Sequence, residues 1–487
     1  MKLNCTKIKK NSIFPALLFM MLALSARMMA QVSVTASAGT MGPTAYTTLN
    51  AAFAAINSGV HQGAIAIAIT ANTTESATPV PLLASGGSSS YSSISIMPSG
   101  GSFTIASAAT PSANRGIIEL AGADNVTLDG DDPGTPGTQN LSVVSSTANV
   151  AGIACIRLSS NSATGLDGAN NNTIKNCIIT GARRSTTSTA DNYGIQFSNG
   201  TGTSSSSTGA YSSLNTLIQG NTITRCYYGI HAIGNSATYL NTGTKIIKNT
   251  IGSATAASYV AFTGIDITYS STTPGATSAL ISQNDVRTGF GSGPATMSSV
   301  LLGDANAGAI ISANNIHDCI NPTSSVWGMY GINISSATSN TGINIYNNFI
   351  RDITGYAIST FGSQYGGWGI YVSAAATGLT INHNTIAQLG STAYGGCIKI
   401  ADGSATVAQF QNNILVNNVN NAVSTCFYTT ANTNISGGAI NYNDYYINPT
   451  GVLGYYNGAN AATFTAWKTA TSKDGNSLNL LPSFVSS

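Results

Sequence analysis

Ile281-Ser-Gln-Asn284-Asp-Val286 and Ile311-Ser-Ala-Asn314-Asn-Ile316 are two copies of the phrase that decides the fold of this chain. The phrase is an apolar residue, two or three positions, Asn, one further residue, and then Ile or Val. It recurs nine times, and most copies are about thirty residues apart. Self-similarity at a period of about 20 to 50 residues is typical of solenoids. The asparagine positions are Asn176, Asn221, Asn249, Asn284, Asn314, Asn348, Asn384, Asn412 and Asn443.

A second phrase, Gly-Ile-x-apolar, falls between successive asparagine phrases. Its alternating β-branched residues predict strands, and no amphipathic helical pattern separates the copies. We therefore expect two short strands in each repeat, paired with the repeats before and after, with the Ile and Val side chains pointing inward. The recurrent Asn suits a tight corner, because it tolerates left-handed backbone angles and its stacked amides can form a hydrogen-bonded ladder. The glycines of this phrase are Gly194, Gly229, Gly264, Gly331 and Gly369.

Together the two phrases resemble those of the right-handed parallel β-helix repeat proteins of the pectate-lyase-like superfamily, of the secreted bacterial surface-protein type. The resemblance implies an all-β chain, a single-stranded right-handed parallel β-helix solenoid with a short N-terminal capping helix. Leu49, Phe53 and Ile56 share one face of that helix, and Thr47 or Thr48 can cap its start. The predicted divisions are a signal peptide at 1–30, an N-terminal cap and first coils at 31–115, repeats at 116–440, and a closing coil and cap at 441–487.

The first thirty residues read as a targeting segment, with a basic start followed by an apolar run from Ile13 to Ala26. They hold five of the 18 basic residues and none of the 16 acidic residues, so the remainder counts 13 bases against 16 acids. A net charge of −3 offers no basic surface for nucleic acid. No later stretch is long and apolar enough to span a membrane. We expect a secreted, extracellular or cell-surface protein, and its oligomeric state stays open.

Cysteines and acids give no metal or cofactor signature. The six cysteines after residue 30 lack zinc spacing, and their apolar neighbours favour buried thiols over disulfides. A group of acids can be read as calcium ligands or as ordinary turn residues, and the turn reading is favoured, so no cofactor is assigned. The acids in that group are Asp124, Asp129, Asp131 and Asp132.

The x position of the Gly-Ile-x-apolar phrase points outward if its apolar neighbours point inward. Successive coils then display one row of side chains on the outer wall. His231 beside Asp266 could form an oriented base, and Tyr371 beside Lys399 could stabilise or abstract a proton next to a uronate. The alternative is that these outward positions are ordinary polar surface. The predicted row is Gln196, His231, Asp266, Leu301, Asn333, Tyr371 and Lys399.

Two further groups are candidates for binding sugar. Arg287, His317 and Arg351 occupy the third place after their Asn on three successive coils, and they suit either an anionic sugar or local salt bridges. The same coils are rich in aromatic residues, which suit either sugar platforms or internal packing. The aromatic binding candidates are Trp327, Tyr330 and Trp368.

Function is argued from sites, because the fold alone does not make an enzyme. The acidic calcium ligands and the catalytic sets that the resemblance implies for pectate lyases and polygalacturonases are absent, and no paired-carboxylate site can be assigned. The leading hypothesis is a non-catalytic glycan-binding or adhesin-like surface module. The runner-up is a polysaccharide lyase or glycoside hydrolase that uses the outward row. A third possibility is an inert spacer within a larger exported protein.

Overall fold

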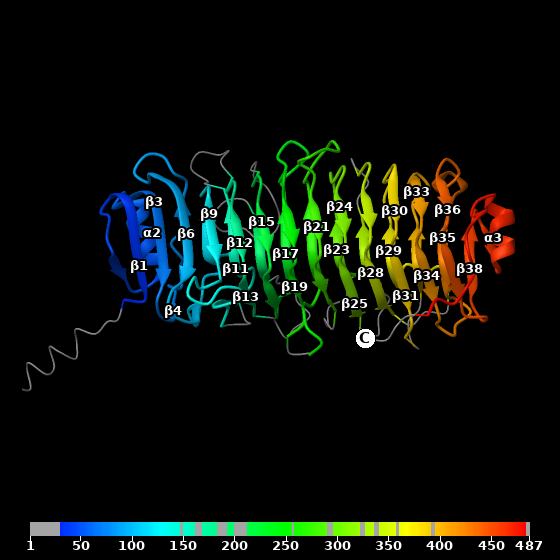
Figure 1. Ribbon diagram of the computed structural model, residues 1–487, viewed down its shortest axis with the longest axis horizontal. Coiled ribbons are helices and arrows are strands. Elements are labelled where there is room, and N and C mark those ends of the chain that lie inside the picture. The colour runs from blue at the N-terminus through cyan, green and yellow to red at the C-terminus, as the bar shows by residue number, and fades with distance from the viewer. Residues whose placement is uncertain are drawn as a thin grey trace, which may run out of the picture.

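Three long sheets wind around one axis in the computed structural model, which is a right-handed parallel β-helix (Figure 1). The coils stack in sequence order from the N-terminal to the C-terminal end of an elongated body (Figure 1). The described residues are 30–146, 150–160, 168–182, 192–198, 212–255, 258–289, 296–321, 327–335, 340–356, 360–390 and 395–483. The predicted signal peptide lies outside them, apart from Ala30. No helix in the described part of the chain is long and apolar enough to cross a membrane.

Within these residues the sheets hold 14, 12 and 13 strands, and we call them sheets A, B and C. Sheet A contains β1 (Val32–Gly39), β2 (Thr44–Tyr46), β3 (His61–Ile69), β6 (Tyr91–Pro98), β9 (Val126–Asp129), β12 (Thr173–Lys175), β15 (Leu217–Gln219), β18 (Lys245–Ile247), β21 (Leu280–Ser282), β24 (Ile310–Ser312), β27 (Asn344–Tyr346), β30 (Leu379–Asn382), β33 (Val407–Gln411) and β36 (Ala439–Asn441). Sheet B contains β4 (Thr73–Thr74), β7 (Phe103–Ala106), β10 (Leu141–Val144), β13 (Cys177–Thr180), β16 (Thr222–Thr224), β19 (Thr250–Ile251), β22 (Asp285–Val286), β25 (Asn315–Ile320), β28 (Phe349–Thr354), β31 (Thr385–Gln388), β34 (Ile414–Asn417) and β37 (Asp444–Ile447). Sheet C contains β5 (Leu82–Leu83), β8 (Gly116–Ala121), β11 (Ala154–Ser159), β14 (Tyr193–Ser198), β17 (Tyr228–Ile233), β20 (Thr263–Thr268), β23 (Met297–Leu302), β26 (Met329–Ile334), β29 (Gly367–Val372), β32 (Gly395–Ile400), β35 (Thr425–Thr429), β38 (Val452–Tyr456) and β39 (Ala459–Ala461).

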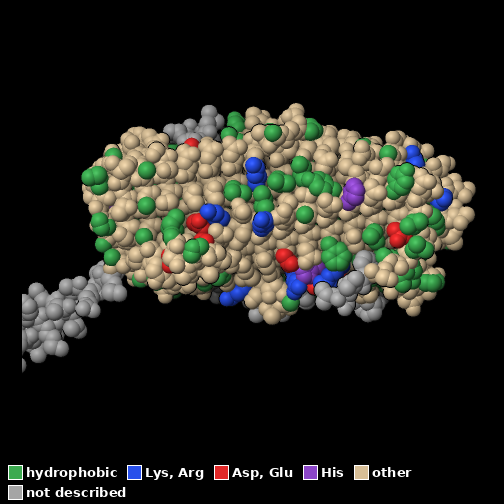
Figure 2. Space-filling model, viewed as in Figure 1, with side chains coloured by type: hydrophobic (Ala, Val, Ile, Leu, Met, Phe, Trp, Pro, Cys, Tyr) green, Lys and Arg blue, Asp and Glu red, His purple; other side chains and the backbone are tan. Residues whose placement is uncertain are grey.

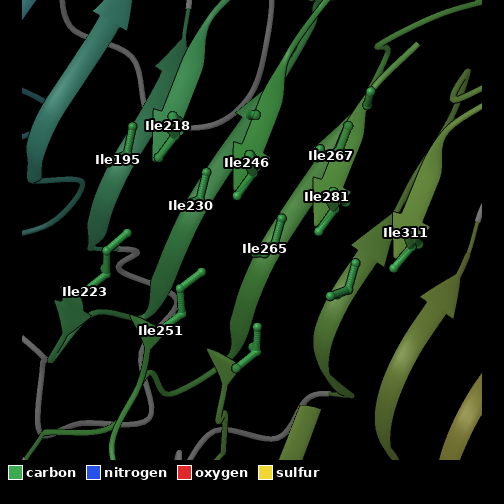
Figure 3. Packing of buried hydrophobic residues seen from close by; sticks show 14 of the residues in the cluster. Ile195, Ile218, Ile223, Ile230, Ile246, Ile251, Ile265, Ile267, Ile281 and Ile311 are labelled. Atoms are coloured by element: carbon green, nitrogen blue, oxygen red, sulfur yellow. The ribbon is translucent and has the colours of Figure 1, made fainter. Parts of the chain in front are cut away.

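Rows of isoleucine fill the space between the sheets. The coils contribute inward apolar residues, mostly Ile or Val, from each sheet, and the residues in one row pair in register from coil to coil (Figure 3). Burying one such side chain contributes roughly 1.5–3 kcal/mol. These side chains come from the repeated phrases, which therefore supply much of the core. Fully buried examples are Ile195, Ile230 and Ile265 on sheet C, Ile218, Ile246 and Ile281 on sheet A, and Ile223 and Ile251 on sheet B.

A central coil has three strands, whereas the sequence analysis expected two. The asparagine phrase spans a corner, with one strand in sheet A before it and another in sheet B after it, as in β15 and β16. The left-handed residue at this corner is the one before the recurrent Asn, as at Lys248, Gln283 and His383. A single left-handed residue bends the chain from sheet A into sheet B and so divides the phrase into two strands.

Buried amides form the expected asparagine ladder. Asn314 is typical: its Nδ2 donates to Asn348 Oδ1 at 2.9 Å, and its Oδ1 accepts from the backbone N of Asn284 at 3.0 Å. Two copies of the phrase were aligned one residue early. Cys177 occupies the ladder position that was assigned to Asn176, and Asn413 occupies the one assigned to Asn412. The ladder runs through Asn221, Asn249, Asn284, Asn314, Asn348, Asn384, Asn413 and Asn443.

Both ends carry capping elements. The predicted N-terminal helix is α2 (Leu49–Asn57), and its cap is Thr48, whose hydroxyl accepts from Ala51 N. Glu75 receives the backbone N–H groups of Leu49 and Asn50 at the same helix start. At the other end, α3 (Phe464–Thr471) buries Trp467 against the last coil.

Asp474 closes the ladder at the C-terminal end. Its carboxylate accepts from Asn443 Nδ2, from the indole Nε1 of Trp467 and from the hydroxyls of Tyr445 and Ser477. Four donors satisfy the oxygens of this buried acid, which therefore ties α3 to the final coil.

The cysteines of the described coils lie in the protein interior. The six thiols are buried and unpaired, as the sequence analysis expected, and burial raises the pKa of five of them. They are Cys155, Cys177, Cys226, Cys319, Cys397 and Cys426.

Candidate functional site

The outward row of sheet C has the register that the sequence predicted. His231 pairs with Asp266, and Tyr371 pairs with Lys399, on neighbouring strands. However, these four side chains are only 3%, 5%, 5% and 6% exposed, so the outer wall of sheet C is closed at all four. From the N-terminal end the row reads Glu119, Arg157, Gln196, His231, Asp266, Leu301, Asn333, Tyr371, Lys399, Tyr428 and Tyr455.

His231 and Asp266 lie at ion-pair distance in the polar half of this row. His231 Nδ1 is 2.9 Å from Asp266 Oδ2. Neither ring nitrogen of His231 forms a hydrogen bond with the described residues. The amide Nε2 of Gln196 and the Oδ1 of Asn333 also lack partners there. These buried polar atoms of the row therefore have no protein partner among the described residues.

Glu119 and Arg157, at the start of the row, were missed by the sequence analysis. Glu119 bonds Arg115 in two places, and it lies 3.4 Å from Arg157 Nη1. Their strands lack the Gly-Ile spacing of the later coils, so the phrase did not place them. The available signal was the alternation of inward residues around each outward one, Ile118 and Leu120 around Glu119 and Ile156 and Leu158 around Arg157.

Aromatic residues occupy the other half of the outer wall. Tyr330 and Tyr371 stack with ring centroids 4.2 Å apart, and Trp368 is fully buried beside them. The ring of Trp368 therefore faces protein rather than solvent. Trp327 is half-buried, and its backbone carbonyl accepts from Asn321 Nδ2. The predicted binding roles of these residues stay predictions.

A short segment, residues 360–366, which we call the strap, covers this aromatic half. Three side chains from three successive coils donate to three consecutive carbonyls of the strap. Lys399 Nζ donates to Gly362 O at 2.5 Å, Trp368 Nε1 to Ser363 O at 3.0 Å, and Tyr330 Oη to Gln364 O at 2.6 Å. These bonds hold the strap against the outer wall of sheet C.

Lys399 lies inside a cage of rings under the strap. Its Nζ is 5.5, 5.2 and 5.1 Å from the ring centres of Trp368, Tyr371 and Tyr428. Burial lowers the pKa of Lys399 from 10.5 to about 8, because the ammonium loses its hydration. A fraction of Lys399 is therefore neutral near physiological pH. The aromatic rings act in the opposite direction, because they stabilise the charged ammonium.

The second predicted group forms a charged network at the corner between β22, β25 and β28. His317 is buried, with Nδ1 2.8 Å from Asp318 Oδ2 and Nε2 3.2 Å from Asp285 Oδ1. Arg351 Nη1 lies 2.9 Å from Asp318 Oδ1, and Arg287 Nη2 lies 3.7 Å from Asp318 Oδ2. The local salt bridges, which the sequence analysis gave as one of two alternatives for these residues, are therefore present. In Figure 2 most of the visible face is tan, and blue, red and purple side chains gather at its lower edge, over β25.

Both acids that contact His317 are more acidic than usual. The hydrogen bond from His317 is the largest cause that lowers the pKa of Asp285. Burial raises the pKa of Asp318, but the hydrogen bond from His317 and the charge of Arg351 outweigh it, so the net shift is downward. Asp352 is the third acid of the network and contacts Arg351. The three carboxylates therefore compensate the charges of the two arginines.

The acids considered as calcium ligands bond to backbone and lysine groups. Asp132 accepts from the N–H groups of Gly100, Gly101 and Gly134, and Asp129 pairs with Lys175 at 2.9 Å. Within the described residues no group of three His, Cys, Asp or Glu side chains is arranged to hold a metal ion.

Comparisons with known proteins found few likenesses. No protein-family model and no curated protein matches the chain. Among solved structures, the Dettilon tailspike protein (gp208) covers 80% of this chain and 67% of its own, at 15% identity and a TM-score of 0.44. A mutant of the periplasmic alginate epimerase AlgG covers 87% of this chain and 97% of its own, at 12% identity and a TM-score of 0.24. At such similarity the functions of these proteins are not transferred, and what the three sheets establish is that this chain is a right-handed parallel β-helix repeat protein.

Proposed function

We propose that this protein is an exported, non-catalytic β-helix module that binds polysaccharide or another cell-surface glycan. The observation that carries the proposal is the closed outer wall of sheet C. Its candidate catalytic side chains are at most 6% exposed, and the strap accepts a hydrogen bond from Lys399. An enzyme that cleaves a polymer needs an open groove at its reacting groups.

The charged corner does not support a site for acidic sugars. Arg287 and Arg351 are half-buried, and both already contact Asp318. An anionic sugar has to displace that carboxylate before it gains either arginine. The network therefore favours a structural role at the corner over a dedicated site for acidic sugars.

A polysaccharide lyase or glycoside hydrolase is the second candidate, and one specific observation favours it. His231 lies 2.9 Å from Asp266, and its ring nitrogens form no hydrogen bond of normal geometry within the described residues. A histidine is the most common general base in enzymes, and a carboxylate beside it stabilises its protonated form. For this candidate the outer wall of sheet C has to open so that a sugar reaches the ring.

The test uses residues 31–487 and a panel of neutral and acidic polysaccharides. Binding is measured by affinity electrophoresis, and the same samples are assayed for unsaturated ends and new reducing ends. We expect binding with neither product. Product formation that disappears in His231→Ala or Lys399→Ala, but persists in Lys245→Ala at an exposed position of β18, establishes the enzyme and overturns the proposal.

Two further outcomes are informative. Binding that weakens in Trp368→Ala, while the variant keeps the parent's circular dichroism spectrum, makes the aromatic half of the outer wall the binding site. Absence of both binding and cleavage on every polymer refutes the glycan proposal, and a structural spacer or a protein-binding adhesin then accounts better for the chain.

A further inference from the structure

An open groove of about 470 Å³ crosses the outer face of sheet A at its N-terminal end. It runs over β1, β3, β6 and β9, and none of the candidate site residues lies in it. In Figure 2 the part of the visible face over β1, β3 and β6, at the left, is mostly tan with scattered green. The lining residues are Thr35, Ala36, Ser37, Ala64, Ile65, Ala66, Ser93, Ile94, Ser95, Asn125 and Thr127.

The groove exists because four neighbouring strands carry small residues at their outward positions. Thr35 pairs with Ala66, Ala66 with Ser95, and Ser95 with Thr127, so these four side chains form one row across the strands. Ala64 and Ser93 form a parallel second row. Inward neighbours such as Val34, Ile67 and Ile96 are buried in the core, as strand alternation requires.

Longer side chains end the small floor farther along the sheet. The first row continues through Thr173 to Leu217 and then Lys245. At these later coils the longer side chains of Leu217 and Lys245 cover the sheet, whereas Ala66 and Ser95 leave it uncovered in the groove. The groove is therefore formed by the small outward side chains of these strands and not by a loop.

The chemistry of the floor is neutral and rich in hydroxyl groups. No lining residue is ionisable. Among the described residues, no hydrogen bond is formed by the hydroxyls of Thr35, Ser93, Ser95 and Thr127, whereas Ser37 Oγ accepts from Ala64 N. Free hydroxyls both donate and accept, and the methyl groups of the alanines suit C–H surfaces.

We propose that this groove binds a neutral glycan chain. The inference rests on the proposed glycan-binding function and names its site and its ligand class. The groove volume lies within the roughly 300–1,000 Å³ that small ligands occupy in proteins. Neighbouring strands lie about 4.8 Å apart, so the hydroxyls of Ser95 and Thr127 are one strand spacing apart and that of Thr35 lies two spacings from Ser95, across Ala66. Hydroxyls at multiples of one spacing suit a ligand whose own hydroxyls repeat along a chain. A site without charge favours a ligand without charge, because a uronate would lose hydration and gain no cation.

The test fills the groove without changing the core. The double variant Ala66→Ile and Ser95→Ile places two β-branched side chains on the floor, where strands tolerate them. The matched control is Ala439→Ile with Thr380→Ile, at outward positions of the same sheet on β36 and β30. The probes are soluble neutral glucan, mannan and galactan, with alginate and polygalacturonate as anionic comparisons.

We expect the parent to bind a neutral polymer with an affinity that changes less than about twofold between low and high salt. The groove variant should lose at least about tenfold in affinity, which corresponds to 1.4 kcal/mol, while the control stays within about twofold. Undiminished binding by the groove variant, or binding confined to the anionic polymers, overturns the inference and leaves the proposed function standing. A parent that binds no polymer refutes both.

Discussion

Removing one rung of the asparagine ladder should destabilise the protein strongly. Asn314→Leu keeps the number of side-chain heavy atoms and the branching at Cγ, and it deletes four hydrogen bonds. The side chain donates to Asn348 Oδ1 and Ile281 O, and it accepts from both the backbone N and Nδ2 of Asn284, all at 2.9–3.0 Å.

The magnitude follows from the partners that are left behind. Asn284 is 1% exposed, so its backbone N–H finds no water after the substitution. Ile281 O and Asn348 Oδ1 each lose one donor, although Asn348 Oδ1 keeps the backbone N–H of residue 314. At roughly 1–3 kcal/mol for each buried group left unsatisfied, we expect a loss of about 3–5 kcal/mol in the free energy of unfolding.

Urea denaturation followed by circular dichroism measures this loss. Asn432→Leu is the control, because Asn432 is exposed and should change stability by less than about 0.5 kcal/mol. An unchanged m-value is required for the comparison, since neighbouring repeats can unfold separately. A loss below about 1 kcal/mol for Asn314→Leu refutes the reasoning, because the hydrogen bonds of the ladder are then no more favourable than the bonds to water that they replace on folding.

Three further perturbations follow from the structure. Burial lowers the pKa of Lys399 from 10.5 to about 8, so its contribution raises stability as pH rises between these values; denaturation at both pH values should show that rise in the parent and a flat response in Lys399→Met, and an equal rise in both disproves it. The pKa of Asp285 is lowered from 3.8 chiefly by His317, so its stabilising contribution is present above that pH and is lost as pH falls through the folded value. Melts from about pH 6 to about pH 3 should therefore fall less steeply for Asp285→Asn than for the parent, and identical slopes count against the network. Thr48→Ala removes the hydroxyl that caps α2 and should cost about 1 kcal/mol in urea denaturation, whereas Thr48→Ser should restore most of it; equal losses in both variants rule out the cap.

Periodic features were predictable from the sequence, and non-periodic ones were not. His231 and Asp266 were placed side by side correctly, because in-register stacking follows once the inward Ile residues are recognised. The corner at Asn412 and Asn413 was misaligned by one residue, because two adjacent asparagines satisfy the same phrase.

The closure of the sheet C wall could not be predicted. An outward strand position faces solvent only if no other segment crosses it, and the strap belongs to no repeat. Its bonds to Tyr330, Trp368 and Lys399 are made by backbone carbonyls, which carry no sequence signature. The groove on sheet A escaped notice for the opposite reason, since Ala, Ser and Thr at outward positions look like ordinary polar surface.

The asparagine ladder has a direction. Every Nδ2 points towards the C-terminal end and every Oδ1 receives from the N-terminal side, so the amide dipoles add along the axis. Asp474 Oδ1 accepts the last of these bonds, and a carboxylate has no N–H to pass onward. The positive end of the dipole array thus meets a negative group, and Asp474 acts as a chain terminator. A solenoid of this kind can lengthen by duplicating an internal coil with its Asn, because each copy both receives and donates, whereas a coil added beyond Asp474 would find no donor to continue the ladder.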